Sequence, residues 1–251
     1  MNMKQYFFVA LLCSLFALSG CESSAEDDVV VRMKFQDNLS LRPMKVIYRS
    51  DRCWSLNFTA SGKPYRKADY TGVELTPQRK GAEGEYEARF PVDRGGLCQW
   101  RLNSVMFGVT YKIAASLEDS VELGSGGGMI VIFDNHGGPR GSADFEASGN
   151  INIKKDYYPW LFEDFHGGLK KIILLGQGDI YLTYKAPQAR EIYFEPVLHS
   201  QYVVRSIEPE RSEKGKYLTF IYPDGSRVTE GQITPSFEML QCIRLPTTCE
   251  Q

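Results

Sequence analysis

The stretch Tyr86-Glu87-Ala88-Arg89-Phe90 alternates apolar and charged side chains. Because successive side chains of a β-strand point to opposite faces, the two aromatic rings and Ala88 fall on one face and the charges on the other. This pattern predicts a half-buried strand, with one face against a core and the other in water. A chain with many such segments is expected to fold into β-sheets.

Short β-rich segments recur on both sides of this stretch, each bounded by Gly, Pro, Asn or Asp. They are residues 29–35, 44–49, 70–75 and 99–114 in the first half, and 151–153, 171–175, 179–184, 191–194 and 202–207 in the second. Residues 216–222 and 226–233 form the clearest hairpin, because Pro223-Asp224-Gly225 favours a tight turn. Short helices are expected only at residues 161–169 and 237–242. The spacing of strands and turns predicts an all-β protein with little helix and an antiparallel β-sandwich architecture.

The middle of the chain predicts a boundary between two packed subdomains. Residues 124–128 contain four glycines, and residues 134–150 are rich in Gly, Ser and Asp, which favour turns. We therefore expect an N-terminal β-sandwich subdomain over residues 29–140 and a C-terminal β-rich subdomain over residues 141–251.

The N-terminus has the order of a secretory signal. Lys4 precedes an apolar run, residues 6–18, and small residues follow that run. The run is shorter than the roughly 20 residues that a membrane-spanning helix needs. Leu18-Ser19-Gly20-Cys21 resembles the lipobox of bacterial lipoproteins. This resemblance implies that residues 1–20 are a lipoprotein signal peptide and that Cys21 is the lipidated first residue of the mature protein.

The residues after Cys21 bear on where such a lipoprotein is held. Residues 21–28 are polar and acidic, which is typical of a solvated tether. In the lipoprotein family, an Asp directly after the lipidated cysteine tends to retain the protein in the inner membrane, whereas this chain has Glu22. The resemblance therefore implies a lipid anchor in the outer membrane, with the protein facing the periplasm.

The remaining cysteines suggest disulfides. Apart from Cys13 in the signal and Cys21, the chain contains Cys53, Cys98, Cys242 and Cys249. An even number in an oxidising compartment predicts two bonds. Three pairings are possible, of which Cys53 with Cys98 and Cys242 with Cys249 is the simplest. The chain has no CxxC pair, so the cysteines do not predict a structural zinc site.

Composition and motifs predict neither nucleic-acid binding nor catalysis. The chain is 43% hydrophobic and 24% charged, with a formal net charge of -2, which is ordinary for a globular protein. Its three histidines show no HExxH spacing, and it has no Gly-x-Ser-x-Gly motif. We expect no catalytic, cofactor-binding or metal-binding residues and no cofactor.

Two aromatic segments are candidate partner-binding surfaces. Residues 156–165 contain five aromatic side chains, which form either a corner of the core or a recognition surface. Tyr65 lies in the basic loop Lys63-Pro64-Tyr65-Arg66-Lys67, which suits an acidic partner, lipid headgroups or simply solvent. The candidate partner-binding residues are Tyr157, Tyr158, Trp160, Phe162 and Tyr65.

A family resemblance rests on three segments: residues 46–50 with Cys53, residues 84–89, and residues 96–102 leading to 105–109. They are similar to small lipoproteins of Gram-negative bacteria that protect the periplasm from type VI secretion toxins, including lipase effectors. The resemblance implies a non-enzymatic immunity protein that binds and inhibits a secreted toxin, encoded by a neighbouring gene. Two other functions remain open: a structural or accessory lipoprotein of a cell-envelope assembly, and an envelope hydrolase with a pair of carboxylates.

Overall fold

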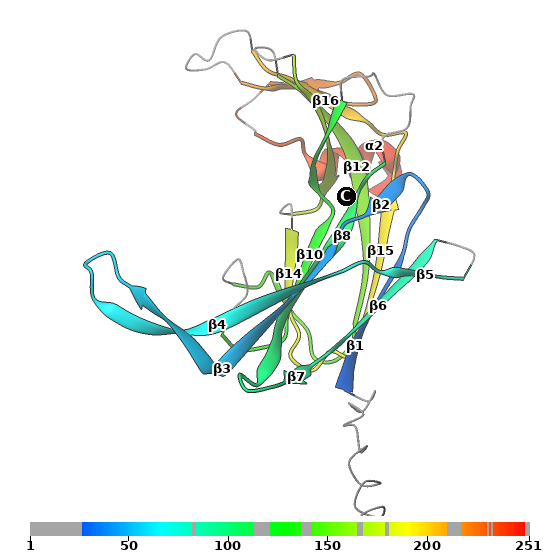
Figure 1. Cartoon of the computed structure of the whole chain (residues 1–251). Coiled ribbons are helices and arrows are strands. Elements are labelled where there is room, and N and C mark those ends of the chain that lie inside the picture. The colour runs from blue at the N-terminus through cyan, green and yellow to red at the C-terminus, as the bar shows by residue number, and fades with distance from the viewer. Residues whose placement is uncertain are drawn as a thin grey trace, which may run out of the picture.

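The computed structural model describes residues 27–81, 84–112, 121–136, 142–164, 168–178, 181–209, 217–229, 231 and 233–248. Its regular structure is almost entirely β, arranged in two sheets (Figure 1). In the described part of the chain, no helix is both long and apolar enough to span a membrane.

The first sheet consists, in spatial order, of β18 (Arg227–Val228), β17 (Thr219–Ile221), β16 (Val204–Ile207), β12 (Ile151–Glu163), β15 (Glu191–Leu198), β1 (Asp28–Lys34), β6 (Glu85–Pro91) and β5 (Gln78–Lys80). β13 (Lys170–Gly176) also pairs with β12, and β9 (Val121–Gly126) pairs with β13. The expected hairpin is present as β17 and β18, which pair antiparallel around Pro223-Asp224-Gly225.

The second sheet consists of β11 (Phe145–Glu146), β14 (Tyr181–Lys185), β10 (Gly128–Ile132), β8 (Trp100–Tyr111), β3 (Met44–Phe58) and β4 (Pro64–Leu75). Two short strands, β2 (Leu39–Leu41) and β7 (Asp93–Gly95), pair with β8. In the last described part of the chain, the short helix α2 (Phe237–Arg244) is followed by a 3-10 turn, η2 (Pro246–Thr248).

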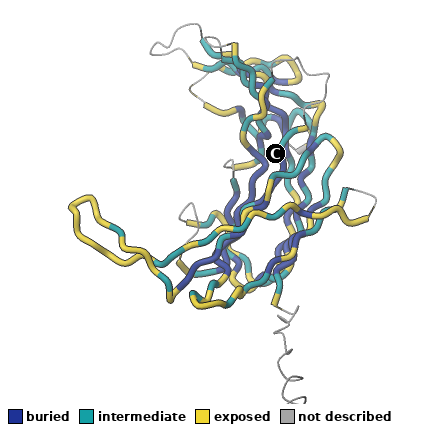
Figure 2. Tube along the Cα trace, in the orientation of Figure 1, coloured by how far each residue is buried: buried dark blue, intermediate teal, exposed yellow. Residues whose placement is uncertain are grey.

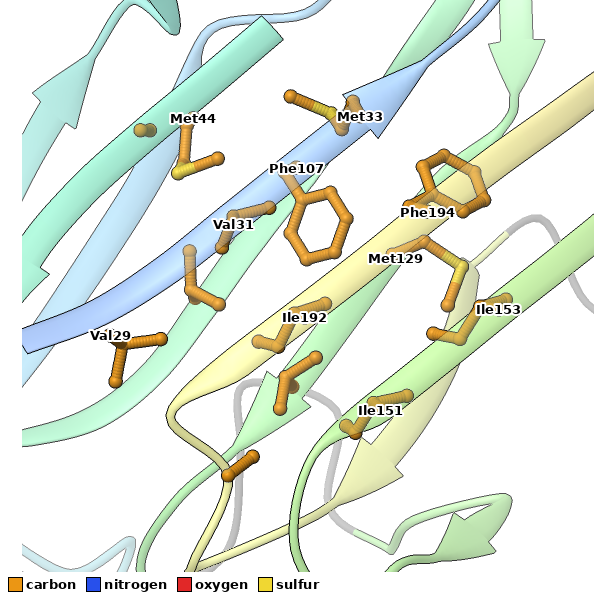
Figure 3. Close-up of a cluster of buried hydrophobic side chains, with 14 of the residues drawn as sticks. Val29, Val31, Met33, Met44, Phe107, Met129, Ile151, Ile153, Ile192 and Phe194 are labelled. Carbon is orange, nitrogen blue, oxygen red and sulfur yellow. The ribbon is translucent and has the colours of Figure 1, made fainter. Parts of the chain in front are cut away.

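The two sheets enclose the main core, which confirms the predicted all-β sandwich. Alternate residues of β1, β12 and β15 point toward side chains of the other sheet (Figure 3). Phe107 and Phe194 come from opposite sheets, and their ring centroids lie 5.8 Å apart. This burial of alternate residues follows from the period of two that the sequence shows.

Pairing direction and the expected boundary differ from the sequence-based picture. The sheets are mixed, because β15 pairs parallel with both β1 and β12, and β10 pairs parallel with β14. Alternation along one strand carries no information on the direction of its neighbours. Strands from both sides of residue 140 share each sheet, so the sheets do not follow the predicted division into 29–140 and 141–251.

A second, smaller core cluster is formed, among the described residues, by residues beyond 150. Its fully or largely buried members are Tyr158, Trp160, Leu175, Val204, Phe220, Tyr222 and Leu240. β12 is long enough to contribute to both clusters. The predicted helix at residues 161–169 is wrong, because residues 161–163 continue β12 between β13 and β16. The helix predicted at residues 237–242 is confirmed as α2, where the Ser236 hydroxyl accepts the Met239 N–H at 3.1 Å as an N-cap.

Candidate functional site

The most prominent surface feature is the far part of the β3–β4 hairpin, residues 52–68, which we call the arm. Figure 1 shows β3 and β4 projecting beyond the body, and Figure 2 shows that the projection is largely exposed. Among the described strands, β8 pairs with β3 only as far as Ser50, and β4 pairs only with β3. The arm is therefore a two-stranded ribbon with both faces in solvent.

The register of the arm separates its side chains into two faces. Trp54 pairs with Ala68, Leu56 with Arg66 and Phe58 with Pro64, and directly paired residues share a face. We call these six residues the apolar face. The intervening pairs, Ser55 with Lys67 and Asn57 with Tyr65, form the polar face.

The apolar face is not covered by any other part of the described chain. Trp54, Leu56 and Phe58 are 46%, 56% and 64% exposed. Large apolar side chains that are clustered and exposed on a soluble protein indicate an interaction surface more than scattered ones do. The arm thus presents a continuous apolar strip on one side of a thin ribbon.

The arm is also strongly cationic. It contains Arg52, Lys63, Arg66 and Lys67, and no Asp or Glu. Among the described residues, none of these four cations forms an ion pair. The Arg66 guanidinium lies 4.0 Å from the ring centroid of Trp54, a cation–π contact that places one positive charge within the apolar face.

The tip of the arm is a short polar turn, residues 59–63. The Thr59 N–H donates to the Lys63 carbonyl and the Gly62 N–H to the Thr59 carbonyl, both at 2.9 Å. Gly62 adopts a φ of +79°, which favours glycine. The large apolar side chains therefore lie along the side of the arm and not at its end.

A bulge and a disulfide lie at the base of the arm, where β3 leaves the sheet after Ser50. The β3–β4 register jumps between Arg49 and Trp54, leaving extra residues on β3 at the point where it leaves the sheet. Cys53 in this bulge is bonded to Cys98, with the two Cα atoms 5.1 Å apart. The buried Ser50 hydroxyl donates to the Cys98 carbonyl and accepts the Arg52 and Cys53 N–H groups. An isolated two-stranded hairpin is only marginally stable, so these contacts support the ribbon at its base.

Ion pairs of Arg49 stabilise the base of the arm further. The largely buried Arg49 guanidinium donates to the carboxylates of Asp51 and Asp134. Burial alone would lower the pKa of Arg49, but its hydrogen bonds to the two carboxylates outweigh burial and raise the pKa. The hydrogen bond from Arg49 lowers the pKa of Asp51. The ion pairs fix the strand just before the bulge.

The predicted partner-binding residues differ in how far they are exposed. Tyr157, Tyr158 and Trp160 are 4%, 0% and 8% exposed, so the partner-binding interpretation is wrong for them and the core interpretation holds. Phe162 is half-buried against the second core cluster. Tyr65 is 45% exposed on the polar face of the arm. Aromatic density alone did not separate core from surface, because burial depends on what covers the faces of β12: Tyr157 packs in the main core, and Tyr158 and Trp160 pack in the second cluster.

The sequence-based candidates missed the apolar side chains at residues 54, 56 and 58. Their alternation with Ser55 and Asn57 is visible in the sequence, and it predicts a strand with one apolar face. Whether another sheet covers that face depends on the tertiary structure.

The second predicted disulfide and the predicted lipidation site lie partly or wholly outside the described residues. Cys242 is disulfide-bonded, whereas its predicted partner Cys249 and the predicted lipidation residue Cys21 are not among the described residues.

A polar network elsewhere joins α2 to the sheet. The Asp156 carboxylate lies 2.7 Å from His199 Nε2 and accepts from Gln241 at 3.1 Å and Arg244 at 3.4 Å. Arg244 also donates to the Tyr158 hydroxyl at 2.9 Å. Burial would raise the pKa of Asp156, but its hydrogen bonds to His199 and Gln241 outweigh it and lower the pKa. The network links β12, α2 and the turn after β15.

A pocket of about 710 Å³ lies between β12, β13 and the start of α2. Its apolar lining includes Ile173 and Leu175 on β13, Trp160 on β12, and Pro235 and Phe237 at the start of α2. Its size is within the range of small-molecule sites. No group of three or more His, Cys, Asp or Glu side chains in the described part of the chain could hold a metal ion.

Comparisons of the chain with protein-family models, with curated proteins and with solved structures found no match. The function is therefore inferred from the exposed side chains and charges of the arm. A rigidly based, cationic ribbon with one apolar face is suited to binding a macromolecule.

Proposed function

We propose that this protein is a periplasm-facing lipoprotein that binds and inhibits an antibacterial toxin delivered by type VI secretion. It acts as an immunity protein, and the arm makes the central contact. The observation that carries this proposal is the exposed apolar face, where Trp54, Leu56 and Phe58 lie on one side of a projecting ribbon. The resemblance of the sequence to immunity lipoproteins supplies the kind of partner.

Inhibition by binding needs shape and favourable burial rather than a reacting group. A ribbon two strands wide can enter a concave site that a flat sheet cannot reach. Removing its apolar side chains from water on binding would stabilise the complex, because each large apolar side chain contributes about 1.5–3 kcal/mol when fully buried. Aromatic and Arg side chains are also the residues that most often dominate binding energy. Trp54 and Arg66 supply both types in contact with one another.

Lipidation of Cys21 would hold the arm close to the membrane from which such a toxin acts. Strand β1 (Asp28–Lys34) begins at the last residue of the tether predicted at residues 21–28. A tethered binder has a high effective concentration near its anchor. Tethering therefore favours capture of a toxin on arrival.

The test is co-purification with the toxin encoded beside this gene, together with survival of cells that receive the toxin. We expect the wild-type protein to bind the toxin and protect the cells. The double substitution Leu56→Ser with Phe58→Ser should abolish both effects. The matched control, Ser55→Ala with Asn57→Ala on the polar face, should retain them.

Two results would contradict the proposal. Absence of binding and protection by the wild-type protein rules out the immunity function. Stable association with an envelope assembly in place of a toxin would instead favour the structural role.

A further inference from the structure

We infer that the arm docks lengthwise into an apolar groove of a protein partner, with Arg66 paired to a carboxylate inside that groove. This inference rests on the proposed function and specifies the chemistry of the surface that the toxin must present. The partner is expected to carry apolar side chains along the groove and acidic side chains both within it and around it.

The distribution of apolar side chains favours a groove. Trp54, Leu56 and Phe58 are spaced along one strand at alternate positions, so they form a strip parallel to the ribbon. The tip, residues 59–63, contains Thr, Ala, Ser, Gly and Lys, and no large apolar side chain. A hairpin that inserts end-on into a bilayer needs its apolar residues at the tip. The arm has them on its side, which suits a cleft that surrounds the ribbon.

The charges favour an acidic partner. All four charged residues between positions 52 and 68 are cations, whereas the whole chain has a formal net charge of -2. The concentration of positive charge on the arm would steer it toward a negatively charged surface. Arg52, Lys63 and Lys67 can contact carboxylates at the rim of the groove.

Arg66 has a different environment from the other three cations. It faces Leu56 across the ribbon and contacts the Trp54 ring at 4.0 Å, so it lies within the apolar face. When that face is covered, its guanidinium leaves water and needs a hydrogen-bonding anion, because a buried unpaired charge is costly. Contact with the Trp54 ring also holds the guanidinium in place before binding. A carboxylate in the groove is the matching group.

Arg66 and Lys67 provide a matched pair of variants. They are adjacent cations on opposite faces of the same strand. Arg66→Glu and Lys67→Glu therefore change the net charge of the arm equally, and a difference between them reports the face. Arg66→Gln, which removes the charge while keeping polarity, separates loss of the ion pair from repulsion.

The experiment measures the affinity of the detergent-solubilised full chain for the toxin encoded by the neighbouring gene. We expect Arg66→Gln to weaken binding by about 30-fold or more, as for truncation of one member of a desolvated charge pair, and Arg66→Glu to weaken it further, because it adds repulsion from the partner's carboxylate. Lys67→Glu should weaken it by less than about 5-fold, as for a rim charge. Equal melting temperatures of all variants would show that each has folded.

Three outcomes would count against the inference. Equal losses for Arg66→Glu and Lys67→Glu would overturn the groove while leaving the immunity function intact. Failure of the wild-type chain to bind the toxin would overturn both proposals. With the lipidated chain in phosphatidylethanolamine–phosphatidylglycerol vesicles, quenching of tryptophan fluorescence by brominated lipid that disappears in Trp54→Phe would assign the apolar face to the bilayer instead.

Discussion

Removal of the Cys53–Cys98 disulfide should destabilise the whole protein and loosen the arm in particular. The bond joins residues 45 positions apart. In the chain-entropy model, closing a loop of this size raises the free energy of unfolding by about 4 kcal/mol. The double substitution Cys53→Ser with Cys98→Ser removes the bond without creating an unpaired thiol. With a urea m-value of about 3 kcal/mol/M for a protein of this size, the unfolding midpoint should fall by about 1.3 M.

The assay is urea unfolding followed by tryptophan fluorescence, with hydrogen exchange of the arm amides measured in parallel. Exchange at residues 54–58 should accelerate more than exchange in β8, because the bond lies at the point where β3 leaves the sheet. Loss of less than about 1 kcal/mol, or uniform acceleration over both strands, would refute the proposed support of the arm by the disulfide.

Three further perturbations test the fold. Leu240→Ala should lower the free energy of unfolding by about 2–5 kcal/mol in urea titrations, because Leu240 is 0% exposed in the second core cluster. Gly126→Ala should lower it by about 3 kcal/mol or more, because φ is +112° and a Cβ would overlap the Leu174 carbonyl oxygen. Asp156 has a lowered pKa, so its ionised form contributes stability above its ordinary pKa of 3.8, and this contribution is lost as pH falls through the folded-state pKa. Unfolding midpoints should therefore fall more steeply between pH 5 and about 2 for the wild type than for Asp156→Asn; parallel profiles would contradict this assignment.

Elements that depend on local sequence match the predictions, whereas elements decided by long-range pairing differ from them. The alternation in residues 86–90 and the helical pattern at residues 237–242 depend on local sequence, and both predictions are correct. Residues 161–163 extend a strand that was expected to become a helix, because hydrogen bonds to β13 and β16 on both sides outweigh local preference. Parallel pairing of β15 with β1 and β12 joins segments too distant for a local pattern to specify.

The amino-acid sequence by itself determined the β character of this protein, the alternation of its strands and the cysteines available for pairing, because these depend on side-chain type and spacing. Only the tertiary structure decided which apolar strips are covered. Tyr158 and Trp160 are enclosed by neighbouring strands and α2, whereas Trp54, Leu56 and Phe58 continue past the last pairing of β3 with β8. Burial is a property of what lies opposite a residue, and that depends on long-range packing rather than on the local sequence.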